Sequence, residues 1–500
     1  MVRQLPTTIV VPTIGRPSLT VTLQALADGV GPSPEDVIVV DDRPSAGALD
    51  PTLTDVGLPS LRVVRSGGGG PARARNLGWR LARTPWVSFL DDDVVPDADW
   101  CERLADDIDG LSGDTAGTQG RVRVPLPTAR RPTDWERSTA GLSTARWITA
   151  DMTYRRSALS AVGGFDERFP RAFREDSDLA LRVGATGGKL VVGARGISHP
   201  VRPARYFASV SQQAGNADDM LMRRLHGPYW REAAGAGRGR RRRHLLTTSC
   251  GLAAIALGLS RRPWLSGLAA AGWLAGLVEF TAARVAPGPR SPSEVLRMAA
   301  TSTVIPPVAT WHTARGLWRH RTAQPWRGLP DLVLFDRDGT LVHDVPYNND
   351  AARVVAVEQA ADALSRLRKA GVRVGIITNQ SGVASGIISA DDLDAVNDRV
   401  EQLLGPFDVV EVCPHGRDET CECRKPAPGM VKRACRTLDV DPSRCVVVGD
   451  IGSDVEAAEA AGAVGILVPT PATRVEEIDS AHRVCPDLDA AMDTIFGGRW

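Results

Sequence analysis

Aromatic residues, cysteine and net charge are all scarce in this sequence, and each shortage excludes a class of protein. Phe, Trp and Tyr make up 5% of the 500 residues, and no basic stripe is interleaved with them, as stacking on nucleic acid would require. The net charge of +1 gives no general attraction for nucleic acid either. Eight cysteines do not make a disulfide scaffold in so long a chain, and three of them crowd between Cys413 and Cys423. We therefore expect no nucleic-acid partner, a reducing compartment and a metal.

The first residues do not have the pattern of a secretory signal. The apolar run in MVRQLPTTIVVPTIGRP is short and interrupted by proline, so we expect a strand and a loop there. Together with a reducing compartment, this predicts a cytoplasmic protein. The length suggests two to four domains, and the ordinary apolar and charged fractions allow each domain to bury a core.

The first third of the chain alternates apolar runs of strand type with helical spacers. Two of the spacers, Leu19–Ala27 and Ala72–Ala82, have helical patterns. Such alternation predicts a mostly parallel α/β sheet. The expected strands are Thr8–Val11, Val37–Val40, Leu61–Val64 and Val87–Leu90.

Two of these strands end in aspartates, one in Asp41-Asp42 and one in Asp91 to Asp93. Clustered carboxylates past a strand suit Mg²⁺ or Mn²⁺, which would hold a diphosphate, although a solvated acidic turn has the same composition. The segment Gly67–Gly70 then leads into PARARNLGWR, where backbone N–H groups could bind phosphate and Arg75 could bind substrate. A mobile loop with solvated arginines is the alternative.

Six segments in this order resemble the family 2 glycosyltransferases of the GT-A fold, over roughly residues 5–230. They are VVPTIGRP, VVDD, GPARARNLG, FLDDDVVP, GGFDERFP and REDSDLALR. The resemblance implies an inverting enzyme that takes a nucleotide sugar donor and a saccharide acceptor. It assigns Asp41 and Asp42 to the nucleotide base or ribose, and Asp91 and Asp93 to Mg²⁺ or Mn²⁺, which would neutralise the leaving diphosphate.

The same resemblance implies roles for two more segments. Asp176, in REDSD, matches the general base that deprotonates the acceptor hydroxyl, with Glu175 beside it. His199, in ISHPV, lies where such enzymes often have a histidine near the diphosphate and metal, although a lone histidine is more often structural.

The middle of the chain, residues 235–330, changes character. A basic run, Arg238 to Arg243, precedes two apolar runs, Leu245–Leu259 and Trp264–Ala283, the second interrupted only by Glu279. The first run covers about 22 Å as a helix, short of a hydrocarbon core of about 30 Å, and the second could just span. We expect a membrane-associated segment over residues 245–283, on the cytoplasmic face, or else a soluble helical bridge between domains.

The last third returns to strand–helix alternation, and polar motifs follow four of its strands. The strand-like run LVLF is followed directly by DRDGT, at residues 336–340. The later motifs are TNQSG at 378–382, RKP at 424–426 and VGD at 448–450. Open α/β sheets place their active sites at such carboxyl ends, although Asp and Gly also favour ordinary turns. The expected strands are Leu332–Phe335, Val372–Ile377, Val409–Val412, Cys445–Val448 and Val464–Val468.

This ordered set resembles the haloacid dehalogenase (HAD)-type phosphatases. The resemblance makes Asp336 the nucleophile and Asp338 the general acid and base. It implies Mg²⁺ held by Asp336, the carbonyl of Asp338, and Asp450. The remaining predicted roles are phosphate binding by Thr378 with Asn379 beside it, charge neutralisation by Lys425, substrate contact by Arg424, and support of the metal site by Asp454.

Four soft ligands lie in one short loop, Cys413, His415, Cys421 and Cys423. Three thiolates and an imidazole complete a tetrahedral zinc shell with no open position, so this Zn²⁺ would be structural; free thiols are the alternative. With this loop, residues 330–475 resemble the heptose 1,7-bisphosphate phosphatases and the related histidinol-phosphate phosphatases. The short spacer between His415 and Cys421 occurs in the histidinol-phosphate branch, but it does not exclude the heptose branch. Fusion to a sugar transferase favours the heptose branch.

The sequence thus predicts two Rossmann-like α/β domains, a GT-A glycosyltransferase over 1–235 and a HAD-like phosphatase over 329–500. An apolar helical segment, 236–328, would join them. We expect a bifunctional enzyme that acts on a sugar phosphate and a nucleotide sugar. A histidinol-phosphate phosphatase fused to a transferase, and a phosphatase with a non-catalytic sugar-nucleotide-binding module, are the alternatives. The oligomeric state is not predicted.

Overall fold

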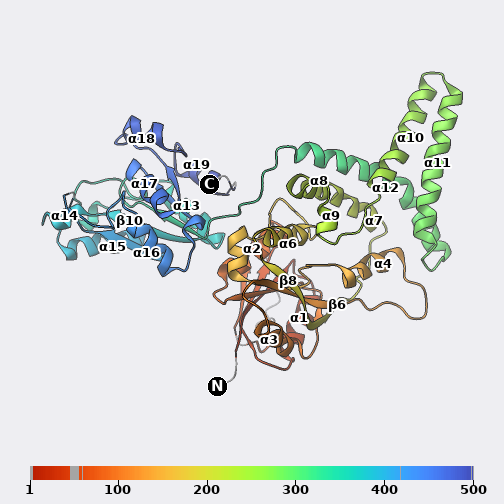
Figure 1. The fold of residues 1–500 in the computed structure, drawn as a ribbon, viewed down its shortest axis with the longest axis horizontal. Helices are drawn as coiled ribbons and strands as arrows, with labels where there is room; N and C mark the ends of the chain where they lie inside the picture. The colour runs from red at the N-terminus through yellow and green to blue at the C-terminus, as the bar shows by residue number, and fades with distance from the viewer. Residues whose placement is uncertain (1–3, 46–55, 59, 417, 497, 499) are drawn as a thin grey trace. The chain divides into compact units, whose positions relative to one another are not determined.

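The chain divides into two units, each with its own sheet (Figure 1). A computed structural model describes residues 4–45, 56–58, 60–416, 418–496, 498 and 500. Unit 1 comprises residues 1–159 and 165–325, and unit 2 comprises 160–164 and 326–500. The predicted fold class, two α/β domains and an apolar helical segment, is confirmed.

Unit 1 contains an eight-stranded sheet in the order β3-β2-β1-β4-β7-β6-β8-β5. The first four strands in this order pair in parallel, and they include all four predicted strands. The other half is mixed, because β7 pairs antiparallel with both β4 and β6, and β5 pairs antiparallel with β8. The strands are β1 Leu5–Thr13, β2 Pro34–Asp41, β3 Leu61–Arg65, β4 Trp86–Leu90, β5 Val95–Pro96, β6 Thr115–Arg123, β7 Asp151–Arg155 and β8 Lys189–Ser198.

The central strands form because their residues can be buried on both faces. β4 is buried at every position, and Val37 to Val40 of β2 are fully buried. Continuous apolar runs of this kind are typical of parallel strands covered on both sides. The helices up to the apolar segment are α1 Ser18–Ala27, α2 Pro71–Leu81, α3 Trp100–Asp109, α4 Asp134–Ala140, α5 Arg156–Val162, α6 Glu175–Ala185, α7 Ala208–Ser211, α8 Gly215–His226 and α9 Trp230–Ala233.

The predicted apolar segment forms three helices that belong to unit 1, α10 Arg241–Leu259, α11 Pro263–Val285 and α12 Pro292–Arg319. Figure 1 shows α10 and α11 side by side as a hairpin that extends away from the sheet of this unit, while α12 runs back toward α8. Among the described helices, α11 alone is long and apolar enough to cross a membrane, and little of it is buried. Arg240 and Arg243 pair with Glu279 at the base of the hairpin.

Unit 2 is built on a five-stranded, fully parallel sheet in the order β11-β10-β9-β12-β13. All five strands were predicted; they are β9 Leu332–Phe335, β10 Arg373–Asn379, β11 Val409–Cys413, β12 Cys445–Gly449 and β13 Val464–Leu467. The helices are α13 Ala360–Lys369, α14 Ser381–Ala384, α15 Ala390–Leu404, α16 Gly429–Thr437, α17 Gly452–Ala461, α18 Val475–Ser480 and α19 Leu488–Phe496. Because β9 lies between β10 and β12, the residues that follow these three strands meet at one edge.

Candidate active sites

Three aspartates and one lysine lie together at the carboxyl ends of β9 and β12. Asp336 follows β9, Asp450 follows β12, and Asp454 lies in the first turn of α17. One carboxylate oxygen from each lies within 4.8 Å of the others, and all three side chains are buried. The Lys425 ammonium donates to Asp336 and to the carbonyl of Ile377, and it lies 2.6 Å from Asp454. The fold therefore brings the predicted nucleophile, metal ligand and lysine into one site.

This cluster holds more negative charge than its own lysine can balance. Burial, with the neighbouring Asp454, raises the pKa of Asp450 to about 7. Burial also raises the pKa of Asp336 well above its usual value, against the opposing charge of Lys425. Burial alone would lower the pKa of Lys425, but Asp336 and Asp454 together hold it above its usual value. Three buried carboxylates and one ammonium fit a divalent cation with oxygen ligands.

Asp338 and Thr378 belong to the same site, but the carboxylate of Asp338 has its own partners. The Oδ2 atom accepts a hydrogen bond from Gln380 Nε2 at 2.8 Å and lies 2.9 Å from Arg337 Nη2. The Thr378 hydroxyl donates to the same oxygen at 3.4 Å. Sequence reasoning missed Arg337 and Gln380, although both stand inside the DRDGT and TNQSG motifs that it used.

The side chains of Asn379 and Arg424 form hydrogen bonds with backbone groups. The Asn379 side chain accepts from the Lys425 N–H at 3.1 Å and donates to the Lys425 carbonyl at 3.2 Å. Arg424 Nη1 donates to the carbonyl of His415 at 3.1 Å, inside the cysteine loop. Both side chains therefore position their neighbours, and the predicted contact of Arg424 with substrate stays a prediction.

The four predicted zinc ligands converge. Their ligand atoms all lie within 4.8 Å of one another, with 3.8 Å between the sulfurs of Cys413 and Cys421 and 3.7 Å between those of Cys423 and Cys421. The Nδ1 atom of His415 lies 3.5 Å from the Cys413 sulfur. Tetrahedral zinc with Zn–S bonds of about 2.3 Å requires sulfur separations of about 3.8 Å. Two of the three sulfur pairs match this value, while the sulfurs of Cys413 and Cys423 are 3.2 Å apart and would have to separate slightly. The donor set therefore fits a structural zinc after this small adjustment.

In unit 1, a cavity of about 420 Å³ lies where β1, β2, β4 and β8 end. Among its lining residues are Asp42, Asp91, Asp93 and His199. Asp91, Asp93 and His199 have ligand atoms within 4.8 Å of one another. Burial, with the neighbouring Asp91, raises the pKa of Asp93. These three predicted ligands therefore fit a cation, as the pattern of acids indicated.

Asp92, the middle residue of the run Asp91 to Asp93, has a different role. Asp92 accepts from the Thr13 hydroxyl and from Arg16 Nη1, each at 2.6 Å. It thereby fixes the loop after β4, and all three aspartates line the cavity. Arg202 Nε lies 2.8 Å from Asp93. Neither Arg16 nor Arg202, both lining the cavity, was found from the sequence, because single arginines in loops give no distinctive pattern.

Arg75 is a buried link between two acidic segments. It donates to Asp91 at 2.8 Å and to Glu175 at 2.9 Å, and it is 1% exposed. The alternative prediction, that Arg75 is a solvated surface side chain, is therefore wrong. Burial, with the neighbouring Asp176, raises the pKa of Glu175 to about 8, and the charge of Arg75 opposes this rise.

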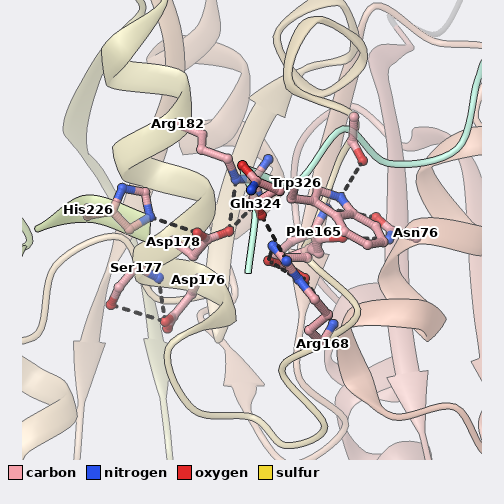
Figure 2. Close-up of polar contacts among 12 residues, drawn as sticks. Asn76, Phe165, Arg168, Asp176, Ser177, Asp178, Arg182, His226, Gln324 and Trp326 are labelled. Atoms are coloured by element: carbon pink, nitrogen blue, oxygen red, sulfur yellow. Dashed lines mark hydrogen bonds and ion pairs between the residues drawn. The ribbon is translucent and has the colours of Figure 1, made fainter. Parts of the chain in front are cut away.

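Asp176 and Asp178 occupy the first turn of α6 with different partners (Figure 2). Asp176 accepts from the backbone N–H of Ser177 at 2.6 Å, and it does not line the 420 Å³ cavity as the described residues define it. Asp178 accepts from His226 Nε2 at 2.7 Å and pairs with Arg182, so it ties α6 to α8. The role of Asp176 as base stays a prediction.

The first acidic pair is used mainly within the protein. Asp41 is bound by Arg43 through two nitrogens, each at 2.8 Å. Asp42 accepts from the backbone N–H groups of Gly69 and Gly70 at 2.9 and 2.8 Å. Two donors of the glycine-rich loop are therefore occupied by Asp42. Of the pair, Asp42 also lines the cavity, while Asp41 does not.

Comparisons with known proteins agree with the two sites. The family model described as Glycosyl transferase family 2 matches residues 8–162, and the model described as HAD-hydrolase-like matches residues 422–491. A D-glycero-β-D-manno-heptose-1,7-bisphosphate 7-phosphatase of Bordetella bronchiseptica is 35% identical over 174 residues, which cover 33% of this chain and 97% of that protein. This chain belongs to the heptose-bisphosphate phosphatase family. It also contains a family 2 glycosyltransferase domain.

Another relative and two solved structures match different shares of this chain. The corresponding phosphatase of Rhodopseudomonas palustris is 41% identical over 144 residues, 27% of this chain and 80% of that protein. A solved D,D-heptose 1,7-bisphosphate phosphatase of B. bronchiseptica, complexed with magnesium and phosphate, shares 32% identity and covers 33% of this chain and 98% of that one, with a TM-score of 0.31. Mannosyltransferase PcManGT from Pyrobaculum calidifontis, in complex with GDP-Man and Mn²⁺, shares 17% identity over 63% of this chain and 88% of that one, with a TM-score of 0.36. Both matched families consist of enzymes, so the chain is a phosphatase and a glycosyltransferase by family.

Proposed function

We propose that this chain is a bifunctional enzyme of saccharide assembly. Unit 2 would remove the 7-phosphate of D-glycero-D-manno-heptose 1,7-bisphosphate, and unit 1 would transfer a sugar from a nucleotide donor with inversion. The observation that carries the first activity is the buried group of Asp336, Asp450, Asp454 and Lys425 in a chain with heptose-bisphosphate phosphatase relatives. The second rests on the acidic cavity of unit 1.

In the phosphatase reaction, a carboxylate oxygen of Asp336 attacks phosphorus and the bond to the sugar oxygen breaks. Asp338 gives its proton to that leaving oxygen and then takes one from the water that hydrolyses the aspartyl phosphate. Lys425 balances charge on the phosphoryl oxygens, and the Thr378 hydroxyl is a donor for them. Arg337 and Gln380 hold Asp338 in place between the two steps.

Asp336, Asp450 and the backbone carbonyl of Asp338 would hold Mg²⁺, with Asp454 supporting the site. A bound Mg²⁺ supplies charge neutralisation for the transferring phosphoryl group. Cys413, His415, Cys421 and Cys423 would hold a structural Zn²⁺ that fixes the loop beside Arg424.

In the transferase reaction, Asp176 would take the proton from an acceptor hydroxyl, whose oxygen attacks the anomeric carbon as the bond to the diphosphate breaks. Asp91, Asp93 and His199 would hold Mg²⁺ or Mn²⁺, which supplies charge for the leaving diphosphate. Asp41 and Asp42 are the candidates for contact with the nucleotide. We assign both activities to one pathway, in which the phosphatase helps make a heptosyl donor that the transferase uses.

The hairpin of α10 and α11 supports a place of action at the cytoplasmic face of a membrane. Its outward side chains include Leu252, Ile255 and Trp264, which are 64%, 63% and 76% exposed. Exposed apolar surface on this scale marks an interaction with lipid or protein. The arginines at its base suit the cytoplasmic side.

The phosphatase assignment is tested by phosphate release from a panel that contains heptose 1,7-bisphosphate, histidinol phosphate and other sugar phosphates. We expect a strong preference for the heptose bisphosphate, with Asp336→Asn as the inactive reference. A preference for histidinol phosphate would contradict both the assignment and the single pathway.

The transferase assignment is tested by metal-dependent hydrolysis of nucleotide sugars, heptosyl nucleotides first, without an acceptor. Asp93→Asn should abolish this hydrolysis and leave phosphate release unchanged. Binding of a nucleotide sugar with no turnover under any metal would instead indicate a non-catalytic module.

A further inference from the structure

Two cavities lie next to each other at the base of the hairpin, where α8, α10 and α12 meet. Their volumes are about 530 and 490 Å³. Arg223, at the end of α8, and Arg241 and Arg242, at the start of α10, line both of them. The two cavities therefore adjoin each other across these arginines, and neither shares a lining residue with the acidic cavity of unit 1.

The smaller cavity is an apolar channel with a basic entrance. Beyond the three arginines, its walls include Leu245 of α10 and Ala309, Ala314 and Leu317 of α12. Leu245 and Leu317 are 53% and 55% exposed. Contact of apolar walls with water is unfavourable, so a cavity of this kind suits a hydrocarbon chain.

The larger cavity is mainly basic, with five arginines on its wall against the two acids Asp219 and Glu232. Arg238 joins Arg223, Arg241 and Arg242 along its wall. Within the described part of the chain, none of these four forms an ion pair with a carboxylate, whereas Arg231 beside them pairs with Asp219. Unpaired guanidinium groups that gather in one cleft repel one another, and a phosphate oxygen cluster relieves this repulsion through bidentate hydrogen bonds.

We propose that these two cavities form a binding site for an acidic phospholipid. The headgroup phosphate lies among Arg223, Arg241 and Arg242, and an acyl chain follows the channel between Leu245 and Leu317. The ligand must be acidic at one end and apolar at the other, which excludes a nucleic acid strand and a free sugar phosphate. The proposal rests on the membrane attachment proposed above, because the site lies where α10 would leave the bilayer.

The test is binding of the full chain to vesicles, measured by flotation. One set contains phosphatidylcholine alone, a second contains phosphatidylglycerol in addition, and inorganic phosphate serves as a competitor. We expect tighter binding to the acidic vesicles, little competition by millimolar phosphate, and about a 30-fold loss of that binding in Arg223→Gln/Arg242→Gln. This loss corresponds to two cations near an acidic surface.

The matched control is Arg353→Gln/Arg436→Gln, which removes two exposed arginines from unit 2 and should leave vesicle binding unchanged. Ala314→Phe, which narrows the channel without changing charge, should also weaken binding to acidic vesicles. Equal binding to both vesicle types, or an unchanged Arg223→Gln/Arg242→Gln, would overturn the lipid site. Efficient competition by phosphate would reduce it to an anion site and also overturn it. Failure to bind any vesicle would overturn the membrane attachment and, with it, the lipid site.

Discussion

Gly339 sets the space between the loop after β9 and the carboxylate of Asp450. Its φ is +85°, and a Cβ atom at this position would overlap the Asp450 carboxylate. In Gly339→Ala we expect a cost of about 1–2 kcal/mol in the free energy of unfolding from the left-handed backbone. We also expect phosphatase kcat to fall about 100-fold, because the metal ligands are displaced. Phosphate release and a Mg²⁺ titration measure the two effects.

Gly386→Ala is the matched control for that variant. Gly386 has a φ of +69° and open space where the Cβ would lie. The Gly386→Ala variant should lose a similar free energy of unfolding to Gly339→Ala and keep its phosphatase activity. Equal loss of activity in both variants would show that backbone strain, and not the overlap with Asp450, is responsible.

Arg75 should contribute much more to the stability of unit 1 than an arginine on the surface does. Above pH 8, where Glu175 is ionised, Arg75→Met leaves this carboxylate buried without its cation, which costs about 3–5 kcal/mol in the free energy of unfolding. Arg62→Met, which removes an exposed partner of Asp36, should cost less than about 1 kcal/mol. Denaturant unfolding compares the two, and similar costs would contradict a stabilising role for the Arg75 link.

The sequence revealed the residues at the ends of strands and missed those whose role depends on a distant partner. Asp336 and Asp450 could be placed together because parallel strands bring their carboxyl ends to one edge. The pairing of Arg75 with Glu175 joins residues that are 100 positions apart. No local pattern distinguishes such an arginine from a solvated one, and the same holds for Arg16 and Arg202.

The cysteine loop after β11 should depend on zinc for its shape. Removal of zinc by a chelator, or the change Cys421→Ser, should lower the melting temperature of unit 2 and weaken phosphatase activity. Cys250→Ser, in α10, is the control and should change neither. Zinc content by elemental analysis, a melting curve and phosphate release give the result. A protein without zinc that melts and works normally would contradict the metal site.

Strand prediction succeeded for the runs buried on both faces, and also for the edge strand β3, whose side chains are mostly exposed. The runs that became β1, β2, β4 and β9 are dense in Val, Ile and Leu, and each one was found. β6 and β8 read TAGTQGRVR and KLVVGARGIS, where glycine and arginine interrupt the apolar pattern. One of these arginines, Arg195, is buried with Asp151 and Asp107, a pairing that only the folded chain reveals.

The two units should unfold as separate transitions, because each encloses its own core. Mg²⁺ with a phosphate analogue at about 100 times its dissociation constant should stabilise unit 2 by about 2.7 kcal/mol. This should move one calorimetric transition upward by about 5–10 °C and leave the other in place. A single transition that moves as a whole would show that the units are coupled.

The charge around Lys425 also dictates an order of events. Lys425 offsets only one of the negative charges that Asp336, Asp450 and Asp454 gain on ionisation, so as the pH rises through about 7, where Asp450 ionises, the pocket increasingly repels a phosphate dianion. Asp336, Asp450 and Asp454 would hold a divalent cation that supplies the missing positive charge, and we expect this charge to be needed before a phosphate group binds. We therefore expect compulsory-order kinetics, with Mg²⁺ as the leading reactant and free phosphate inhibiting only the magnesium-loaded enzyme.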